Sequence, residues 1–301
     1  MLLRWEALIS LFVIVIGFNH FSNYLKLTKP VRDKTNTFKV LSYNLHMFNY
    51  FENKNLINSE KQVFGFIKTQ KADIICLQEF FAIVDPVQKE ALMKTALGGK
   101  YYSHMKVLGN GKNRFYGIAT FSRFPIIKRG EIIHPGSSSL SIYTDILIRN
   151  DTFRIYNNHL QSFRLKTMER SFLLEMASPD DKETIDEVKT LSVSLRKGFV
   201  RRAIQAQSVK DHMKKSPYPV IVAGDFNDTP VSYTYRKIRK GLHDSFVNSG
   251  YGAGFTYKGN YPPNRIDYIL YEDPLINSYF EIIRVKYSDH YPVVAYFKNR
   301  N

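Results

Sequence analysis

The stretch from Val220 to Asn227 reads VIVAGDFN, a short apolar run that ends on two polar side chains, Asp225 and Asn227. β-Branched and small apolar residues in a run of this length, bounded by turn residues, predict a buried β-strand. Alternate side chains of an extended segment point the same way, so Asp225 and Asn227 can meet one ligand. We therefore predict a strand over Tyr218–Gly224 with a polar site at its end.

The same arrangement recurs along the chain, where apolar runs end or begin on polar residues that a strand does not need. These residues are Asn44 after LSY, Glu79 after IICLQ, His159 after IYNN, Asp267 at the start of IDY, and Asp289 with His290 before the last apolar run. Singly, each is typical of a helix cap or a turn. Six such places in one chain favour a shared site.

These residue types suit phosphoester chemistry. Glu79 and Asp289 are hard oxygen ligands for Mg²⁺ or Mn²⁺, and Asn44 could add a neutral oxygen. An acidic neighbour such as Asp267 would orient His290 and favour its charged form. Cleavage of a phosphate ester needs an oriented water, neutralisation of the phosphate oxygens and help for the leaving oxygen.

Composition and periodicity predict a sheet-rich domain. Aromatic residues make up 14% of the 301 residues, which favours strands over a helical bundle. Further strands are expected at 38–45, 74–77, 117–121, 141–148, 153–159, 266–270, 280–285 and 293–297. Helical spacing marks 62–71, 168–175 and 186–215. Many strands with a few helices predict two packed sheets flanked by helices.

The net charge of +16 fits a polyanionic partner: a nucleic acid, an acidic lipid surface or a phosphorylated substrate. A solvated basic surface explains the charge equally well. The single cysteine, Cys76, lies in an apolar run and is expected in the core, so no disulfide can form within one chain.

The N-terminal segment is strongly apolar. Ala7–Phe18 reads ALISLFVIVIGF, which is shorter than the roughly 20 residues of a spanning helix, although Trp5–Phe21 comes closer. A signal peptide and a buried helix are the alternatives, but no small-x-small cleavage site follows the run. We expect residues 1–25 to be an uncleaved membrane anchor and residues 26–36 a linker. The side of the membrane that carries the domain is left open.

The motifs SYN, LQE, HLQS, GDFN, RIDY and SDH, in this order, resemble the endonuclease/exonuclease/phosphatase superfamily. That group includes deoxyribonuclease I, abasic-site endonucleases, bacterial neutral sphingomyelinases and inositol-polyphosphate 5-phosphatases. The resemblance covers roughly residues 37 to 298. It implies that residues 37–299 form one α/β domain, a four-layer sandwich of two mostly antiparallel sheets flanked by helices.

The resemblance also implies a metal site. Glu79 would be the main ligand of Mg²⁺, or of Mn²⁺, with Asn44 beside it and Asp289 in support. A tyrosine that contacts phosphate in the nucleases would align with Phe115 or Tyr116, and the alignment does not decide between them.

The remaining motif residues take catalytic roles by the same resemblance. Asp225 would orient or deprotonate the attacking water, and Asn227 would bind a phosphate oxygen. His290, paired with Asp267, would stabilise the pentacovalent transition state. His159 matches the histidine that assists the leaving group in the deoxyribonuclease and sphingomyelinase branches.

Three functions remain open at this point. The first is a membrane-associated phosphoesterase acting on a lipid headgroup, an inositol phosphate or a similar ester. The second is a metal-dependent nuclease acting on DNA or RNA. The third is a non-catalytic binding module on the same fold. The N-terminal segment favours the first, and no obligate protein partner is expected.

Overall fold

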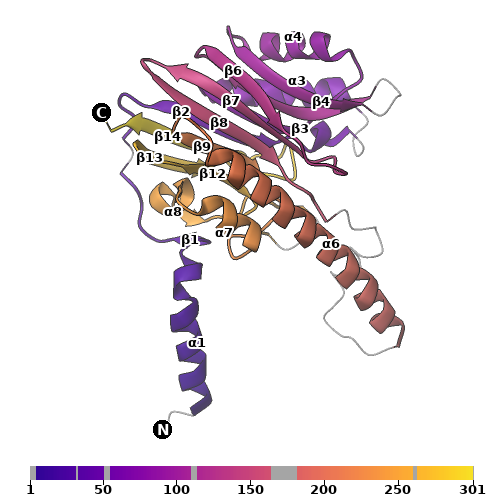
Figure 1. Ribbon diagram of the computed structural model, residues 1–301, viewed down its shortest axis with the longest axis vertical. Helices are drawn as coiled ribbons and strands as arrows, with labels where there is room; N and C mark the ends of the chain where they lie inside the picture. The colour runs from indigo at the N-terminus through magenta and orange to yellow at the C-terminus, as the bar shows by residue number, and fades with distance from the viewer. Residues whose placement is uncertain are drawn as a thin grey trace.

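The computed structural model describes residues 5–31, 33–50, 55–109, 114–163, 182–259 and 263–300. Two six-stranded sheets pack against each other (Figure 1). The first sheet has the order β13 (Leu275–Ile282), β14 (Val293–Asn299), β2 (Phe38–Asn44), β3 (Ile74–Ala82), β5 (Phe115–Ser122) and β4 (Tyr102–Gly109). The second has the order β10 (His243–Asp244), β12 (Asp267–Tyr271), β9 (Val220–Asp225), β8 (Asp151–His159), β7 (Leu140–Ile148) and β6 (Ile126–Ile132).

The two-residue alternation of the strands divides their side chains between an inner and an outer face. In β9, Ile221 and Ala223 join the core between the sheets, whereas Val220 and Val222 join the core beneath the helices. In β2, Val40 faces the other sheet and Leu41 faces outward. The central strands of both sheets are therefore buried on both faces, which explains their nearly continuous apolar runs.

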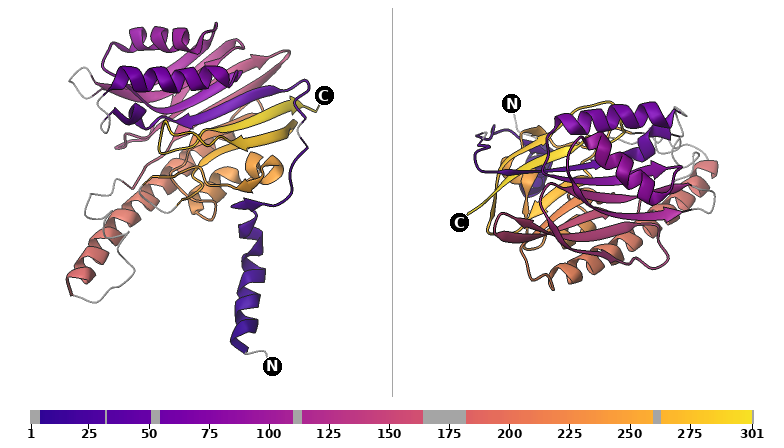
Figure 2. Two further views of the ribbon diagram at one scale, coloured as in Figure 1. Left: turned by 180° about the vertical axis from the view of Figure 1, so that it is seen from behind. Right: turned by 90° about the horizontal axis from the view of Figure 1, so that it is seen from above.

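Helices cover the two outer faces (Figures 1 and 2). Helices α3 (Leu56–Thr69) and α4 (Pro86–Leu97) pack on the first sheet. Helices α6 (Lys182–Met213) and α7 (Tyr233–Arg239) pack on the second. The short elements η1 (His46–Asn49) and α8 (Ser245–Ser249) lie in connections. The arrangement confirms the predicted four-layer α/β sandwich. The helix expected over 168–175 lies outside the described residues.

Most neighbouring strands are antiparallel, as predicted, but two pairs are parallel: β2 with β3, and β8 with β9. The carboxyl ends of parallel neighbours lie at the same edge of a sheet. The starts of β14 and β12 reach that edge because these strands run antiparallel to β2 and β9. All six polar strand ends found in the sequence are thus carried to one end of the sandwich.

The N-terminal segment forms a separate helix, α1 (Trp5–Phe21), that extends away from the sandwich (Figure 1). It is joined to the domain through β1 (Leu25–Lys26), which pairs with β11 (Gly252–Ala253). Over the described residues, no helix has both the length and the apolar character needed to cross a membrane.

Candidate active site

Three of the candidate residues lie side by side on the second sheet. His159, the last residue of β8, is in register with Asp225 of β9, and Asp225 is in register with Asp267 of β12. Their positions continue the inward-facing series of each strand, so the side chains meet at the mouth between the sheets. Gly224 makes room here, because a Cβ at this residue would lie 2.0 Å from the Asn158 carbonyl oxygen.

Glu79 reaches the same place from the first sheet through an irregularity of β3. The register of β3 with β5 shifts between Leu77 and Phe80, and Glu79 has a φ of 50°. Such a bulge redirects a side chain at a functional edge. Oε1 of Glu79 lies 2.9 Å from Nε2 of His159, an ion contact that is poorly aligned for a hydrogen bond.

Asn44 connects the two sheets at the site. Its Nδ2 donates to Oδ2 of Asp225 at 2.9 Å and to Oε1 of Glu79 at 3.4 Å. Its Oδ1 accepts from the backbone nitrogen of His46 at 3.0 Å. The amide nitrogen, and not the oxygen expected to bind metal, therefore faces the carboxylates. In this arrangement Asn44 holds Glu79 and Asp225 in position.

Asn227, in the loop that follows β9, donates hydrogen bonds to the Asp225 carboxylate. Its backbone nitrogen donates to Oδ1 of Asp225 at 2.7 Å, and its Nδ2 donates to Oδ2 at 3.1 Å and to the Leu160 carbonyl at 3.0 Å. Asn227 has a φ of 52°, a conformation that asparagine tolerates better than most residues. Asp225 and Asn227 therefore lie together, as expected for two side chains that meet one ligand.

His290 and Asp267 form the expected pair. Nδ1 of His290 lies 2.9 Å from Oδ2 of Asp267, and both side chains are buried. Nε2 of His290 is turned toward Oδ2 of Asp225 at 3.8 Å and Oδ1 of Asp289 at 3.9 Å. These two distances exceed a hydrogen bond, so neither carboxylate accepts one from Nε2 in this arrangement.

Burial and neighbouring charges shift the pKa values of the site residues in different directions. Burial raises the pKa of Glu79, but the nearby His159, together with the charges of His290 and His46, outweighs burial and holds the pKa at about 2. Burial lowers the pKa of His159, but the nearby Glu79 and the charge of Asp225 together raise it above its ordinary value. Burial lowers the pKa of His290 as well, yet the charges of Asp267 and Asp225 raise it to about 10.

Asp225 behaves differently from Glu79. Burial raises the pKa of Asp225 to about 6 against the opposing charge of His290, and the charge of Asp267 adds to the rise. A carboxylate with a pKa near neutrality can take up a proton during a reaction and release it afterwards. A protonated His290 next to it can donate to an anionic group.

All eight residues singled out in the sequence thus lie in one connected cluster: Asn44, Glu79, His159, Asp225, Asn227, Asp267, Asp289 and His290. The two candidates for the tyrosine position lie on the strand next to Glu79. Phe115 is in register with Ala82, and Tyr116 with Phe81. Neither pairing decides between them.

Residues that the sequence did not single out support the cluster. Nδ1 of His46 lies 3.3 Å from Oδ1 of Asp289. Oγ1 of Thr256 accepts from the backbone nitrogen of Asp267 at 3.1 Å, and the ring of Tyr257 packs edge-on against His290. Between the sheets, Nε2 of Gln78 donates to Oδ1 of Asn157 at 2.7 Å. The last two residues belong to the LQE and NNH endings, which was the only sequence signal for them.

The donor set fits a hard divalent cation. Carboxylate oxygens prevail in the cluster, and Oδ1 of Asp267 is buried without a hydrogen-bond partner among the described residues. Asp225, Asp267 and His290 offer ligand atoms within 4.8 Å of one another. This group does not include Glu79 or Asp289, the ligands expected from the sequence.

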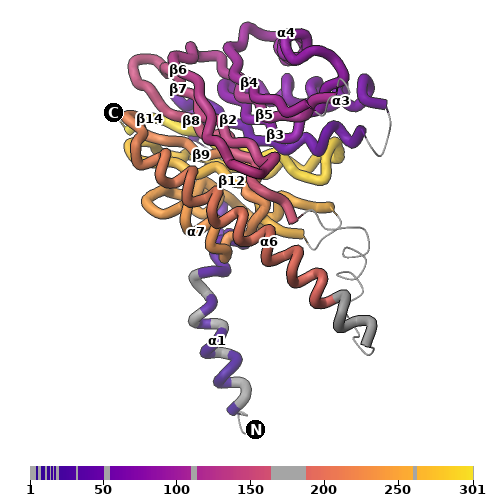
Figure 3. Tube along the Cα trace, turned by 45° about the vertical axis from the view of Figure 1, so that its right-hand side comes forward, coloured from indigo at the N-terminus to yellow at the C-terminus, as the bar shows by residue number. Residues whose placement is uncertain are grey.

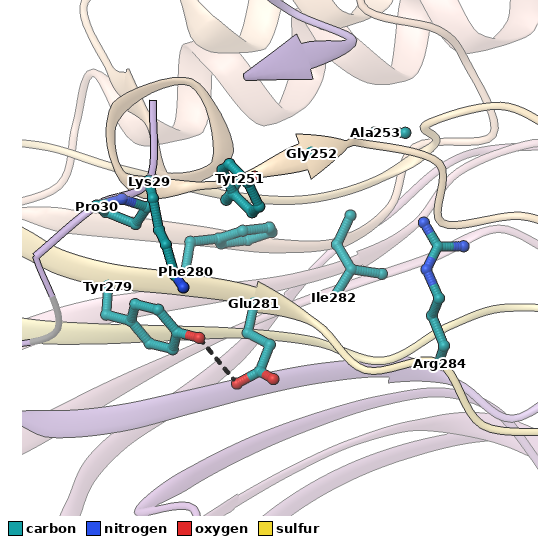
Figure 4. Close-up of a pocket in the computed structure, with 10 residues that line it drawn as sticks. All are labelled: Lys29, Pro30, Tyr251, Gly252, Ala253, Tyr279, Phe280, Glu281, Ile282 and Arg284. Carbon is teal, nitrogen blue, oxygen red and sulfur yellow. Dashed lines mark hydrogen bonds between the residues drawn. The ribbon is translucent and has the colours of Figure 1, made fainter. Parts of the chain in front are cut away.

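A separate pocket of about 300 Å³ lies between the edge strand β13 and the segment that follows α1 (Figure 4). Lys29, Tyr251 and Arg284 are among its lining residues, and none of the eight cluster residues lines it. The pocket is therefore distinct from the cluster.

Comparison with known proteins gives two results. The sequence profile of the Endonuclease/Exonuclease/phosphatase family matches residues 41–290. No curated protein sequence matches the chain.

Solved structures share the fold at low sequence identity. A family protein from Leptotrichia buccalis C-1013-b is 18% identical, with a TM-score of 0.61, over 88% of this chain and 100% of that one. A humanized D. rerio TDP2 is 15% identical, with a TM-score of 0.60, over 88% and 100%. A mannosyl-6-phosphatase from Bacteroides thetaiotaomicron VPI-5482 is 18% identical, with a TM-score of 0.60, over 87% and 99%.

Proposed function

We propose that this chain, which belongs to the endonuclease/exonuclease/phosphatase family, is a magnesium-dependent phosphoesterase that works at a membrane surface. Members of the family hydrolyse phosphate esters, so the reaction class follows from membership. The metal, the substrate and the membrane are the further parts of the proposal. Its substrate would be a phosphodiester or phosphomonoester of a lipid headgroup or an inositol-phosphate-like compound.

One observation carries the reaction: Nε2 of His290 faces Asp225 and Asp289 across 3.8 and 3.9 Å. A phosphate oxygen that approaches Nε2 beside these carboxylates would accept a hydrogen bond from the protonated imidazole. Asp225, whose pKa is about 6, would take the proton of the water that attacks the phosphorus opposite the leaving oxygen. Asn227 and Asn44 would keep its carboxylate aimed, since both donate to it.

The other groups act on charge and on the leaving oxygen. A divalent cation held by Glu79 and Asp289 would neutralise charge on the phosphate. His159, whose pKa is raised above its ordinary value, would carry a proton that it can donate to the leaving oxygen. Asp267 would hold the His290 ring and stabilise its charge through Nδ1.

The membrane part of the proposal rests on the N-terminal region. We take residues 1–25 as a membrane-anchoring segment, residues 26–36 as a linker and residues 37–299 as the catalytic domain. Trp5, Phe12 and Val15 of α1 are all more than half exposed, and moving such apolar side chains out of water is favourable.

A nuclease is the second candidate, and the net charge of +16 favours it, because phosphate backbones attract basic surfaces. TDP2 and the mannosyl-6-phosphatase share this fold with the chain, so the fold itself does not choose a substrate.

The deciding experiment presents the purified protein, with Mg²⁺, to plasmid DNA, sphingomyelin vesicles and an inositol phosphate in parallel. We expect phosphate release or headgroup release from one of the last two substrates, and loss of that activity in His290→Ala. Cleavage of DNA alone would establish the nuclease. If none of these substrates, nor an aryl phosphodiester, is hydrolysed while one of them binds, the chain is a binding module.

A further inference from the structure

Helix α6 has two different faces. Its inner face packs on the second sheet through Ala206, Val209 and Met213. The opposite face is formed by Val193, Arg196, Lys197, Val200, Arg201 and Ile204, all of which are exposed. Their spacing of three or four residues places these side chains on one stripe of the helix. We call this stripe the outer face of α6.

The composition of the outer face is unusual for a surface in water. The side chains of Val193 and Val200 are each 51% exposed, and that of Ile204 is 62% exposed. Three cations, Arg196, Lys197 and Arg201, flank them on the same stripe. Basic side chains beside exposed aliphatic ones suit a surface that is both anionic and apolar, such as the interface of an anionic membrane.

The position of α6 fits such contact. The N-terminal half of α6 extends beyond the sheets, and it does so on the same side of the sandwich as α1 (Figures 1 and 2). Figure 3 shows the two helices projecting in this direction after a further rotation. The two helices therefore project on the same side of the sandwich.

The buried side of α6 is connected to the active-site loops. Nη1 of Arg202 donates to the Gln161 carbonyl at 2.8 Å, and its Nε donates to Oδ2 of Asp228 at 3.1 Å. Gln161 follows His159 by two residues, and Asp228 directly follows Asn227. The guanidinium also lies 4.1 Å from the ring centroid of Phe163. A surface that holds α6 would thus sit close to the loops that carry His159 and Asn227.

We propose that the outer face of α6 docks on an anionic lipid surface and brings the active site to it. The proposal rests on the membrane-surface phosphoesterase proposed above and names the surface that such an enzyme would use. A nucleic acid would satisfy the three cations, but it offers no apolar phase to Val193, Val200 and Ile204. A bilayer interface satisfies both kinds of side chain.

Flotation of the full chain with vesicles tests the proposal. The vesicles are phosphatidylcholine alone and phosphatidylcholine mixed with phosphatidylserine. We expect tighter binding to the mixed vesicles. Arg196→Gln with Lys197→Gln should weaken that binding by about thirtyfold, since each basic residue near an anionic surface contributes about 1 kcal/mol.

A second variant removes the apolar contacts. Val193→Ser, Val200→Ser and Ile204→Ser together should weaken binding to both kinds of vesicle by roughly tenfold or more. The matched control is Ile57→Ser with Val87→Ser and Leu92→Ser, at exposed positions of α3 and α4 on the opposite outer layer. The control should bind as the wild type does. Because α1 is unchanged in every variant, the comparison isolates α6.

Three outcomes would overturn the docking proposal. The first is wild-type binding in the serine variant, and the second is an equal loss in the control. In the third, the wild type does not bind vesicles, and the glutamine variant loses binding to a DNA duplex. That result would make the outer face of α6 a nucleic-acid surface. Circular dichroism of each variant separates lost docking from lost folding.

The function itself is measured separately on the wild type with a water-soluble aryl phosphodiester and Mg²⁺. Vesicle binding without hydrolysis of any phosphate ester would leave the docking surface in place and remove the proposed function. Hydrolysis of the aryl ester without the predicted change in vesicle binding would keep the proposed function and remove the docking surface.

Discussion

Asp267 and His290 are joined by a buried contact of 2.9 Å between Oδ2 and Nδ1, although one residue begins β12 and the other precedes β14 of the opposite sheet. The contact therefore bridges the two halves of the sandwich at the site. It leaves Nε2 as the nitrogen that faces Asp225 and Asp289.

This pair should behave as one functional unit. We expect His290→Ala and Asp267→Ala each to lower kcat by about 10²- to 10⁴-fold, the usual contribution of a positioned proton donor. The double variant should be no slower than the slower single variant, because groups that act together are not additive. Steady-state kinetics on an aryl phosphodiester checks this. A double variant whose loss of kcat equals the product of the two single losses would show that the residues act independently.

Glu79 should control metal binding. Glu79→Gln removes a charge from a hard-cation site, so we expect Mg²⁺ affinity to fall by about tenfold or more while the fold is retained. Titration calorimetry with Mg²⁺ measures the affinity, and a chelator should abolish wild-type activity until Mg²⁺ or Mn²⁺ is restored. Glu131→Gln, at an exposed position paired with Lys106, is the matched control. Activity that survives chelation would remove the metal from the mechanism.

His159 should matter most when the leaving group is poor. An activated aryl leaving oxygen needs little protonation, whereas an alkyl alcohol needs a proton. We expect His159→Ala to lower kcat by about 10²-fold or more with an alkyl ester and by much less with an aryl ester. Equal losses on both esters would assign His159 to phosphate binding. Lost stability with normal turnover per folded molecule would make it a structural residue.

Gly224 should be needed for both the fold and the site. It has a φ of 129°, and a Cβ there would meet Asn158 backbone atoms at 2.0 to 2.8 Å. We expect Gly224→Ala to lower the free energy of unfolding by more than about 2 kcal/mol. Gly241→Ala is the control, since Gly241 also has a positive φ but has open space around it, and should cost about 1 kcal/mol. Urea denaturation compares the two variants. Equal losses in the free energy of unfolding would mean that the contact with the Asn158 backbone adds no cost.

His104 should make the protein less stable in mild acid. Burial, with the charge of Arg129, lowers the pKa of His104 from 6.5 to about 4 in the folded chain. Between pH 6.5 and 4 the unfolded chain binds this proton and the folded chain does not, so the free energy of unfolding falls as pH falls through that window. Denaturation at several pH values should show a shallower fall in His104→Gln. An unchanged slope would mean that His104 is accessible to protons in the fold.

Strand β6 was not predicted and β13 was predicted with other bounds, and both differences have a physical explanation. β6 reads IIKRGEI and is largely exposed at the edge of its sheet, so it has no clear apolar alternation to reveal it. β13 was expected at Phe280–Val285 but runs from Leu275 to Ile282, because its pairing with β14, and not its own apolar pattern, sets its ends.

Sequence alone determined which polar residues stand where the apolar runs of the site end, because the change from apolar to polar residues is a local property of the chain. It could not determine how those endings meet. The bulge that turns Glu79, the amide orientation of Asn44, the Gln78–Asn157 contact and the link from Arg202 to the site loops all depend on neighbours that are distant in sequence. Such contacts exist only after the two sheets and α6 have packed, so only the tertiary structure decided them.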